Sequence, residues 1–189
     1  MNGLDLLIAD HNRFRGMFSR FRAAHEAADA ETMIELVGKV FEDLEVHTTI
    51  EEDIFYPAVH DIEQEIGETV DEGIQEHHVV KVLMEELGQV EPASVEWWAK
   101  MMVLIENVEH HAKEEETSLF PPVRSAMDAV ALEEMGTQFE QMKVKFGAPV
   151  LADKIDFTKQ DLMELASRQE IPGRSKMSHE ELAATVAPA

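Results

Sequence analysis

The chain has 189 residues, of which 44% are hydrophobic and 29% charged, and its formal net charge is −23. It has no cysteine, which excludes disulfides, thiolate metal sites and a cysteine nucleophile, so any metal must be held by histidine, carboxylate or water. The acidic surface disfavours nucleic acid and anionic membranes as partners, and every apolar run is interrupted well before the ~18 residues of a membrane span.

Five segments carry apolar residues at every third or fourth position, as amphipathic helices do. In chain order they run from about Leu4 to Ala28, Glu31 to Val59, Val70 to Val90, Ser94 to Met127 and Leu132 to Phe146. We expect Ile34 and Ile74 to lie on the core faces of the second and third segments. The low content of glycine and proline also favours an all-α fold, so we predict a four-helix bundle followed by a fifth helix.

The composition changes from about Gly147, where Pro149 and Asp153 are typical of a linker. Beyond it we predict two short helices, Lys159 to Arg168 and Ser178 to Val186, with an extended turn between them. We therefore divide the chain into a bundle over residues 1–146 and a small helical tail over residues 153–189. The first ten residues lack the basic and apolar regions of a signal peptide, and a cytoplasmic location is expected.

A repeat links the two halves of the bundle. The stretch from His47 to Pro57 matches the stretch from His111 to Pro121 at a constant offset of 64, with His, Glu and Pro aligned. Upstream, Asp10-His11 matches Glu76-His77 at an offset of 66. Each half therefore contributes one lone histidine and one His-x-x-x-Glu motif, all on apolar helix faces.

Polar groups on an apolar face are costly unless something pairs with them, and a metal site inside the bundle provides a common explanation. The spacing of four residues puts His and Glu on one face of a helix, one turn apart. We predict these metal ligands: His11, His47, Glu51, His77, His111 and Glu115. Imidazole and carboxylate together suit iron, manganese or zinc, and six ligands exceed what one tetrahedral zinc needs.

Three neighbouring groups, His78, His110 and Glu114, do not follow the repeat, so we expect them either on the outer faces of their helices or in contact with the metal ligands without binding the metal. His25, His60 and His179 have no partner in the repeat and are expected on the surface. Tyr56, the single tyrosine, lies five residues beyond Glu51. We expect it either to pack at the end of the bundle or to stand beside the metal ligands.

These motifs make residues 1–146 resemble the haemerythrin-like proteins of the HHE cation-binding family, whose pattern is H…HxxxE…H…HxxxE. The resemblance implies an up-down bundle that holds two iron ions, bridged by the two glutamates and by an oxo or hydroxo group. The oxygen-carrying haemerythrins have a further histidine where this chain has Lys81, and an aspartate where it has Glu116. Two six-coordinate irons with the six predicted ligands and the bridging oxygen would keep about two positions open for a small molecule.

Three functional interpretations follow. The first is a protein that binds or turns over dioxygen, peroxide or nitric oxide, with catalase-like or peroxidase-like peroxide disproportionation as the enzymatic form. The second is an iron-sensing or redox-sensing module whose tail, residues 153–189, docks a protein partner. The third, a structural zinc bundle, fits the ligand number poorly. The tail resembles the helix–loop–helix modules of Rho-type termination factors and SAP domains. For the chain as a whole we expect a monomer or weak oligomer.

Overall fold

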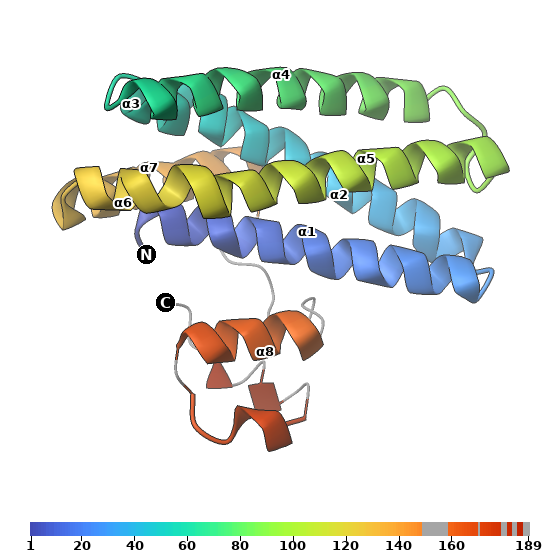
Figure 1. The fold of residues 1–189 in the computed structure, drawn as a ribbon. Coiled ribbons are helices and arrows are strands. Elements are labelled where there is room, and N and C mark those ends of the chain that lie inside the picture. The colour runs from blue at the N-terminus through green and yellow to red at the C-terminus, as the bar shows by residue number, and fades with distance from the viewer. Residues whose placement is uncertain (149–158, 170, 179–180, 183–184, 187–189) are drawn as a thin grey trace.

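The computed structural model describes residues 1–148, 159–169, 171–178, 181–182 and 185–186. Four long helices build the bundle: α1 (Gly3–Glu26), α2 (Ala30–Ile50), α4 (Gln64–Leu87) and α5 (Val95–Glu114). Shorter helices follow α2 and α5, namely α3 (Tyr56–Val59) and α6 (Phe120–Ala126), and a further long helix is α7 (Ala129–Phe146). The described residues contain no strand, which confirms the predicted all-α bundle (Figure 1).

Side chains at the helix starts fix where several helices begin. Asn2, Asp29, Ser94 and Asp128 each accept a hydrogen bond from the backbone N–H three residues further on. The third predicted helix begins at Gln64 rather than near Val70. Ile66 is buried one turn before Val70, so the apolar face of α4 begins one turn earlier than predicted.

The second and fourth predicted helices are continuous in direction, but each contains one π-helical turn, η1 (Glu51–Phe55) and η2 (Glu115–Leu119). Both turns begin at a predicted ligand and end just before a proline, Pro57 or Pro121. A proline inside a helix has no N–H and crowds the preceding turn, and a wider turn relieves this. Single π turns of this kind are frequent at functional sites.

The core has two apolar clusters, one on each side of the predicted ligands. One includes Phe14, Phe18 and Leu104, and the other includes Leu7 and Phe55. The polar layer therefore lies at mid-length in the bundle, surrounded by apolar side chains. A charged group placed there is shielded from water along the bundle axis on both sides.

Two predicted core residues are on the surface instead. Ile34 is 46% exposed and Ile74 is 38% exposed. On α4 the buried stripe passes through Gly73, which has no side chain and so gives no apolar signal in the sequence. On α2 the neighbouring Met33 takes the core position.

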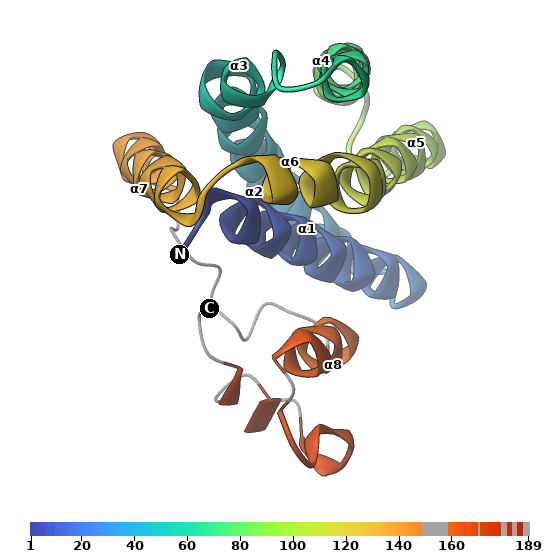
Figure 2. The same cartoon turned by 60° about the vertical axis from the view of Figure 1, so that its left-hand side comes forward.

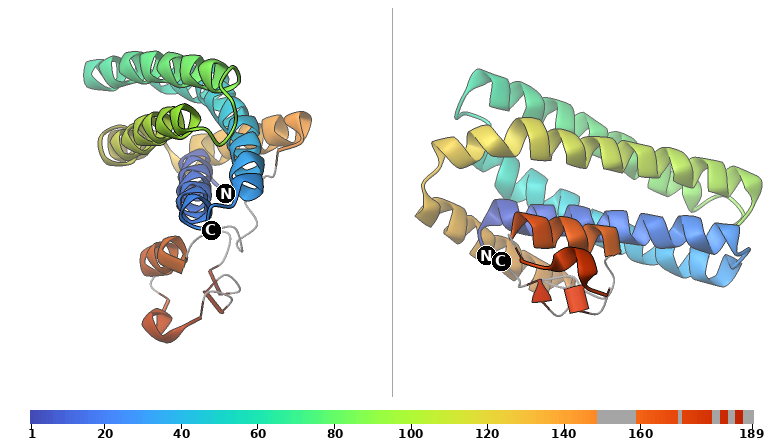
Figure 3. Two further views of the ribbon diagram at one scale, coloured as in Figure 1. Left: turned by 90° about the vertical axis from the view of Figure 1, so that its right-hand side faces the viewer. Right: turned by 60° about the horizontal axis from the view of Figure 1, so that its bottom comes forward.

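Helix α7 lies against α1 and α2 (Figures 1 and 2). Among the residues that the structure describes, no helix covers α4 and α5 in the same way (Figure 3). The bundle is therefore covered on one side only, which matters for the site below.

In the tail, α8 (Lys159–Arg168) has the predicted bounds and lies beside α1. A short 3-10 turn, Arg174–Lys176, follows within the stretch predicted to be extended. Leu162, Ala166, Leu182 and Val186 form a small apolar cluster of their own. The predicted helix Ser178 to Val186 lies partly outside the described residues, and the division into two domains stays a prediction. None of the described helices is long and apolar enough to cross a membrane.

Candidate metal centre

The six predicted ligands converge on one place in the middle of the bundle. Each of its four long helices contributes one histidine, and the two glutamates are the first residues of the π turns. All six side chains are buried, with residue exposures from 0% for Glu51 to 6% for His111. Burial of two carboxylates among four histidines is costly unless positive charge lies among them, and this indicates a cation site.

The donors form two groups with the Nε2 atoms of the histidines facing inward. His11 and His47 lie with Glu51 and Glu115 in one group, and His77 and His111 lie with Glu51 in the other. Within each group, one candidate ligand atom per residue lies within 4.8 Å of the others. The two groups share Glu51, so its carboxylate faces both sets of donors.

Glu51 stands between the two groups. Its Oε1 lies 3.2 Å from Nε2 of His47, and its Oε2 lies 3.2 Å from Nε2 of His77. Glu115 has a similar place, since its Oε2 lies 3.3 Å from Nε2 of His11 and 3.7 Å from Nε2 of His111. Carboxylates placed in this way can bridge two metal ions.

Some of these inward-facing atoms have no hydrogen-bond partner. Four buried side-chain atoms stand out in the described part of the chain: His11 Nε2, both carboxylate oxygens of Glu51, and Glu115 Oε2. Buried polar atoms are nearly always paired, and here all four face a common centre. A cation coordinated by them satisfies all four at once, so the residues present fit a metal centre.

The outward nitrogen of every histidine meets a carboxylate, which we call its outer carboxylate. The Nδ1 atoms of His11, His47, His77 and His111 lie 3.0, 3.4, 2.9 and 2.7 Å from oxygens of Glu116, Asp10, Glu52 and Glu76, respectively. Since a carboxylate only accepts, Nδ1 donates its hydrogen, which leaves the lone pair of Nε2 for a metal. Such partners orient metal-binding histidines and make them more basic.

The outer carboxylates follow the repeat. Asp10 and Glu76 precede the lone histidines and bond the His-x-x-x-Glu histidine of their own half. Glu52 and Glu116 follow the predicted ligands Glu51 and Glu115 and contact the lone histidine of the opposite half. The contacts between the histidines and their outer carboxylates therefore follow the same pattern in both halves, as in a site with two-fold symmetry.

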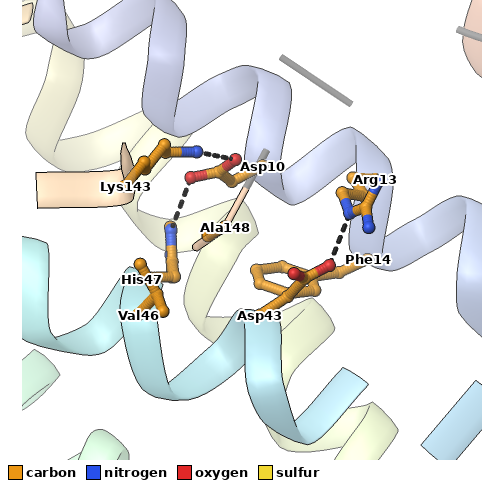
Figure 4. A pocket seen from close by; sticks show the side chains of 8 residues that line it. All are labelled: Asp10, Arg13, Phe14, Asp43, Val46, His47, Lys143 and Ala148. Carbon is orange, nitrogen blue, oxygen red and sulfur yellow. Dashed lines mark hydrogen bonds and ion pairs between the residues drawn. The ribbon is translucent and has the colours of Figure 1, made fainter. Parts of the chain in front are cut away.

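Cationic side chains hold the outer carboxylates in turn. Arg15 donates to Glu116 at 2.9 Å, and Lys81, which matches Arg15 at the offset of 66, donates to Glu52 at 2.7 Å. Lys81 therefore contacts an outer carboxylate and not the centre itself. It occupies the position where the oxygen carriers have a histidine. Lys143, on α7, forms a hydrogen-bonded ion pair with Asp10 (Figure 4).

Tyr56 breaks the symmetry inside the centre. Its hydroxyl donates to Oε1 of Glu115 at 3.0 Å and lies 3.4 Å from Nε2 of His111. The residue at the matching position, Phe120, stacks on His11 and has no hydroxyl. Gly73 makes room for the phenol, because a Cβ there would lie 2.9 Å from the hydroxyl oxygen. Tyr56 therefore stands beside the predicted ligands, although it also packs at that end of the bundle.

The electrostatics of the metal-free cluster indicate a demand for positive charge. Burial alone lowers the pKa of His11, but the Glu115 and Glu116 carboxylates outweigh it and raise the pKa to about 9. For His111, burial also lowers the pKa, yet Glu115 and Glu51 shift it well above its usual value. Without a metal, protons take the place of the cation next to these carboxylates.

The remaining histidines in the described part of the chain lie away from the centre. His25 and His78 are exposed and His60 is 43% exposed at its side chain, while His179 lies outside the described residues. His110 is 69% exposed and approaches Glu76 at 3.8 Å. With Glu114 these two residues form a separate outer group of potential metal donors.

Sequence reasoning identified the convergent six but missed the outer carboxylates and Lys143. The signal for the carboxylates was present, since Asp10/Glu76 and Glu52/Glu116 repeat beside the ligands. No periodic signal marks Lys143, which reaches the site only because α7 folds back on α1.

One of the comparisons with known proteins supports a cation site. A family model described as Hemerythrin HHE cation binding domain matches residues 2–123. The chain is also 28% identical over 145 residues to a protein of Nostoc sp. (strain PCC 7120) described as a DNA nickase. That alignment covers 77% of this chain but only 40% of the relative. No solved structure matched the chain.

Proposed function

The chain belongs to the hemerythrin HHE cation-binding family, and on that premise we propose that it is a non-haem di-iron protein that binds or turns over small oxygen species. The single observation that carries the proposal is that four buried atoms without hydrogen-bond partners face one centre between four histidines. The proposed cofactor is a pair of iron ions with an oxo or hydroxo bridge, held by His11, His47, Glu51, His77, His111 and Glu115. Such a pair supplies electron transfer to dioxygen or peroxide when bound.

The protein's own groups support this chemistry in three ways. The outer carboxylates hold each imidazole with Nε2 facing inward. Glu51 and Glu115 offer carboxylate oxygens to both groups of donors. The hydroxyl of Tyr56 is a proton donor within the cluster, bonded to Glu115, and burial raises its pKa, so it stays protonated.

Burial also limits the size of the reactant. No ligand residue is more than 6% exposed, which suits dioxygen, peroxide or nitric oxide. A two-metal centre can in principle cleave phosphodiesters, and the Nostoc relative is described as a DNA nickase. A net charge of −23 and a buried centre both disfavour DNA as the substrate here.

The test is metal analysis of protein from iron-replete cells, with an optical and Mössbauer spectrum and an assay of oxygen release from peroxide. We expect about two irons per chain, as the proposed centre requires. The near-ultraviolet charge-transfer bands of a bridged ferric pair should vanish in the His47→Ala/His111→Ala variant. A protein that binds zinc alone, or a DNA-nicking activity of the natural chain that is lost in that variant, contradicts the proposal.

The alternative function, a sensing module whose tail docks a protein partner, is favoured by the separate apolar cluster of the tail. In that case a chain ending at residue 148 keeps its metal and spectrum. Loss of the bundle on this truncation would show instead that the tail is structural. Peroxide turnover by the truncated chain at the rate of the full chain would favour the enzymatic function.

A further inference from the structure

Lys143 is the one lysine or arginine that is buried among the residues that the structure describes, with 3% exposure. It extends from α7 to Asp10, and Asp10 in turn accepts from Nδ1 of His47 (Figure 4). Burial of an ammonium group is costly, and here the cost is met by a direct ion pair. The positive charge of Lys143 is thus fixed beside Asp10, the carboxylate that contacts the predicted ligand His47.

Within the part of the chain that the structure describes, the matching carboxylate in the other half has no lysine or arginine partner. Glu76 accepts from Nδ1 of His111 as Asp10 does from His47, but its other neighbour is the exposed His110. Its side chain is 21% exposed, against 11% for Asp10. The difference arises from α7, which within the described ranges lies against α1, α2 and the π turn η1 of this half of the bundle.

The sequence of the two halves shows that this inequality is built in. The positions that match His110 and Glu114 at the offset of 64 are Val46 and Ile50, both buried in the apolar cluster that contacts α7. One half therefore offers an apolar surface to α7 and receives its lysine. The other half carries polar groups at the same places and stays open to water.

We propose that Lys143 makes the two metal positions unequal, so that the position between His77 and His111 takes the first divalent cation and the position between His11 and His47 the second. This rests on the proposed function, which supplies the two-metal site. The other outer pairs, Arg15–Glu116 and Lys81–Glu52, balance each other across the centre. Lys143 offsets the charge of Asp10, whereas the charge of Glu76 remains available to the cation.

The test titrates Co²⁺ into the metal-free full-length chain and follows the Nδ1 protons of the four histidines by paramagnetic NMR. At about one Co²⁺ per chain we expect two shifted signals, followed by two more at about tenfold higher free Co²⁺. The first pair is assigned to His77 and His111 if Glu52→Gln and Glu76→Gln displace it. Signals that rise together in all four histidines overturn the proposal.

Charge variants test the part played by Lys143. In Lys143→Met the two steps should merge, because Asp10 regains its full effect on His47. The Asp10→Asn/Lys143→Met variant again has a neutral pair, so the steps should separate as in the natural chain. Lys145→Met, an exposed lysine on the same helix, is the matched control and should change nothing.

Failure of the proposed inequality and failure of the proposed two-metal function give different results. If Lys143→Met keeps both steps apart while its helical content is unchanged, Lys143 is merely structural and the proposal is wrong. If only one Co²⁺ binds at saturation, the two-metal function itself is wrong. Binding of two Co²⁺ with equal affinity leaves the proposed function standing and refutes the inequality.

Discussion

Oε1 of Glu52 lies 2.9 Å from Nδ1 of His77, although the two residues come from opposite halves of the repeat. The reverse contact joins Glu116 to His11 at 3.0 Å. Each half therefore orients the lone histidine of the other, and the donors of one half alone cannot form the site. Metal binding should consequently stabilise the docking of the two halves.

Metal removal should lower stability. A bound cation gives the four buried atoms without hydrogen-bond partners a coordination partner, so the loaded chain should unfold at a higher temperature than the metal-free chain. The gain should reach about 2.7 kcal/mol for each bound ion when free metal exceeds its dissociation constant about a hundredfold. Calorimetry at several metal concentrations measures it, with His78→Ala as a control that should respond as the natural chain does. A Tm independent of added metal would contradict the prediction.

The adjacent residues Glu114 and Glu115 offer a matched comparison of two glutamates. Glu115→Ala removes a carboxylate that faces both donor groups, and at least one metal ion per chain should be lost. Glu114→Ala changes the neighbouring residue, in the outer group with Glu76, and should retain both ions. Metal content by mass spectrometry after gel filtration decides. Equal losses in the two variants would mean that the repeat misassigned the ligand.

The outer carboxylates should modulate the metal affinity, most of which comes from the six predicted ligands. Glu52→Gln keeps the size of the side chain but weakens its hold on His77, and metal affinity should fall by about 10-fold to 100-fold. Competition with a chelator of known affinity measures the change. Asp53→Asn alters the exposed next residue and serves as the control. An unchanged affinity in Glu52→Gln would show that the contact is incidental.

Much of the site could be predicted because its signal is local. A helix places residues four apart on one face, so His47/Glu51 and His111/Glu115 are readable as units, and the shared offset selects them from neighbours such as His110. The bounds of α8 were also predicted correctly.

The rest depended on tertiary structure. Lys143 reaches Asp10 across 133 positions of sequence through the docking of α7, and nothing local marks it. Gly73 has no side chain and so adds nothing to an apolar pattern, yet its lack of a Cβ leaves the space that the phenol of Tyr56 occupies. The π turns follow from the proline pair, but their start at the ligands appears only in three dimensions.

Gly73 and Tyr56 should behave as one unit. A methyl group on residue 73 would lie 2.9 Å from the hydroxyl of Tyr56 and 3.3 Å from Cε1 of His111. Gly73→Ala should therefore cost about 1–3 kcal/mol of stability through overpacking, despite the better helix propensity of alanine. Tyr56→Phe removes the hydroxyl and leaves Oε1 of Glu115 without its donor, at a cost of about 1–3 kcal/mol.

The double variant separates packing from hydrogen bonding. With the hydroxyl already absent, the added methyl group has space, so Gly73→Ala should cost less in the Tyr56→Phe background than alone. Urea unfolding of the four metal-free chains gives the interaction free energy, and Gly38→Ala, whose Cβ would meet nothing within 4 Å, is the control. Strict additivity would mean that the methyl group strains His111 rather than the phenol, and that Gly73 is required by the ligand itself.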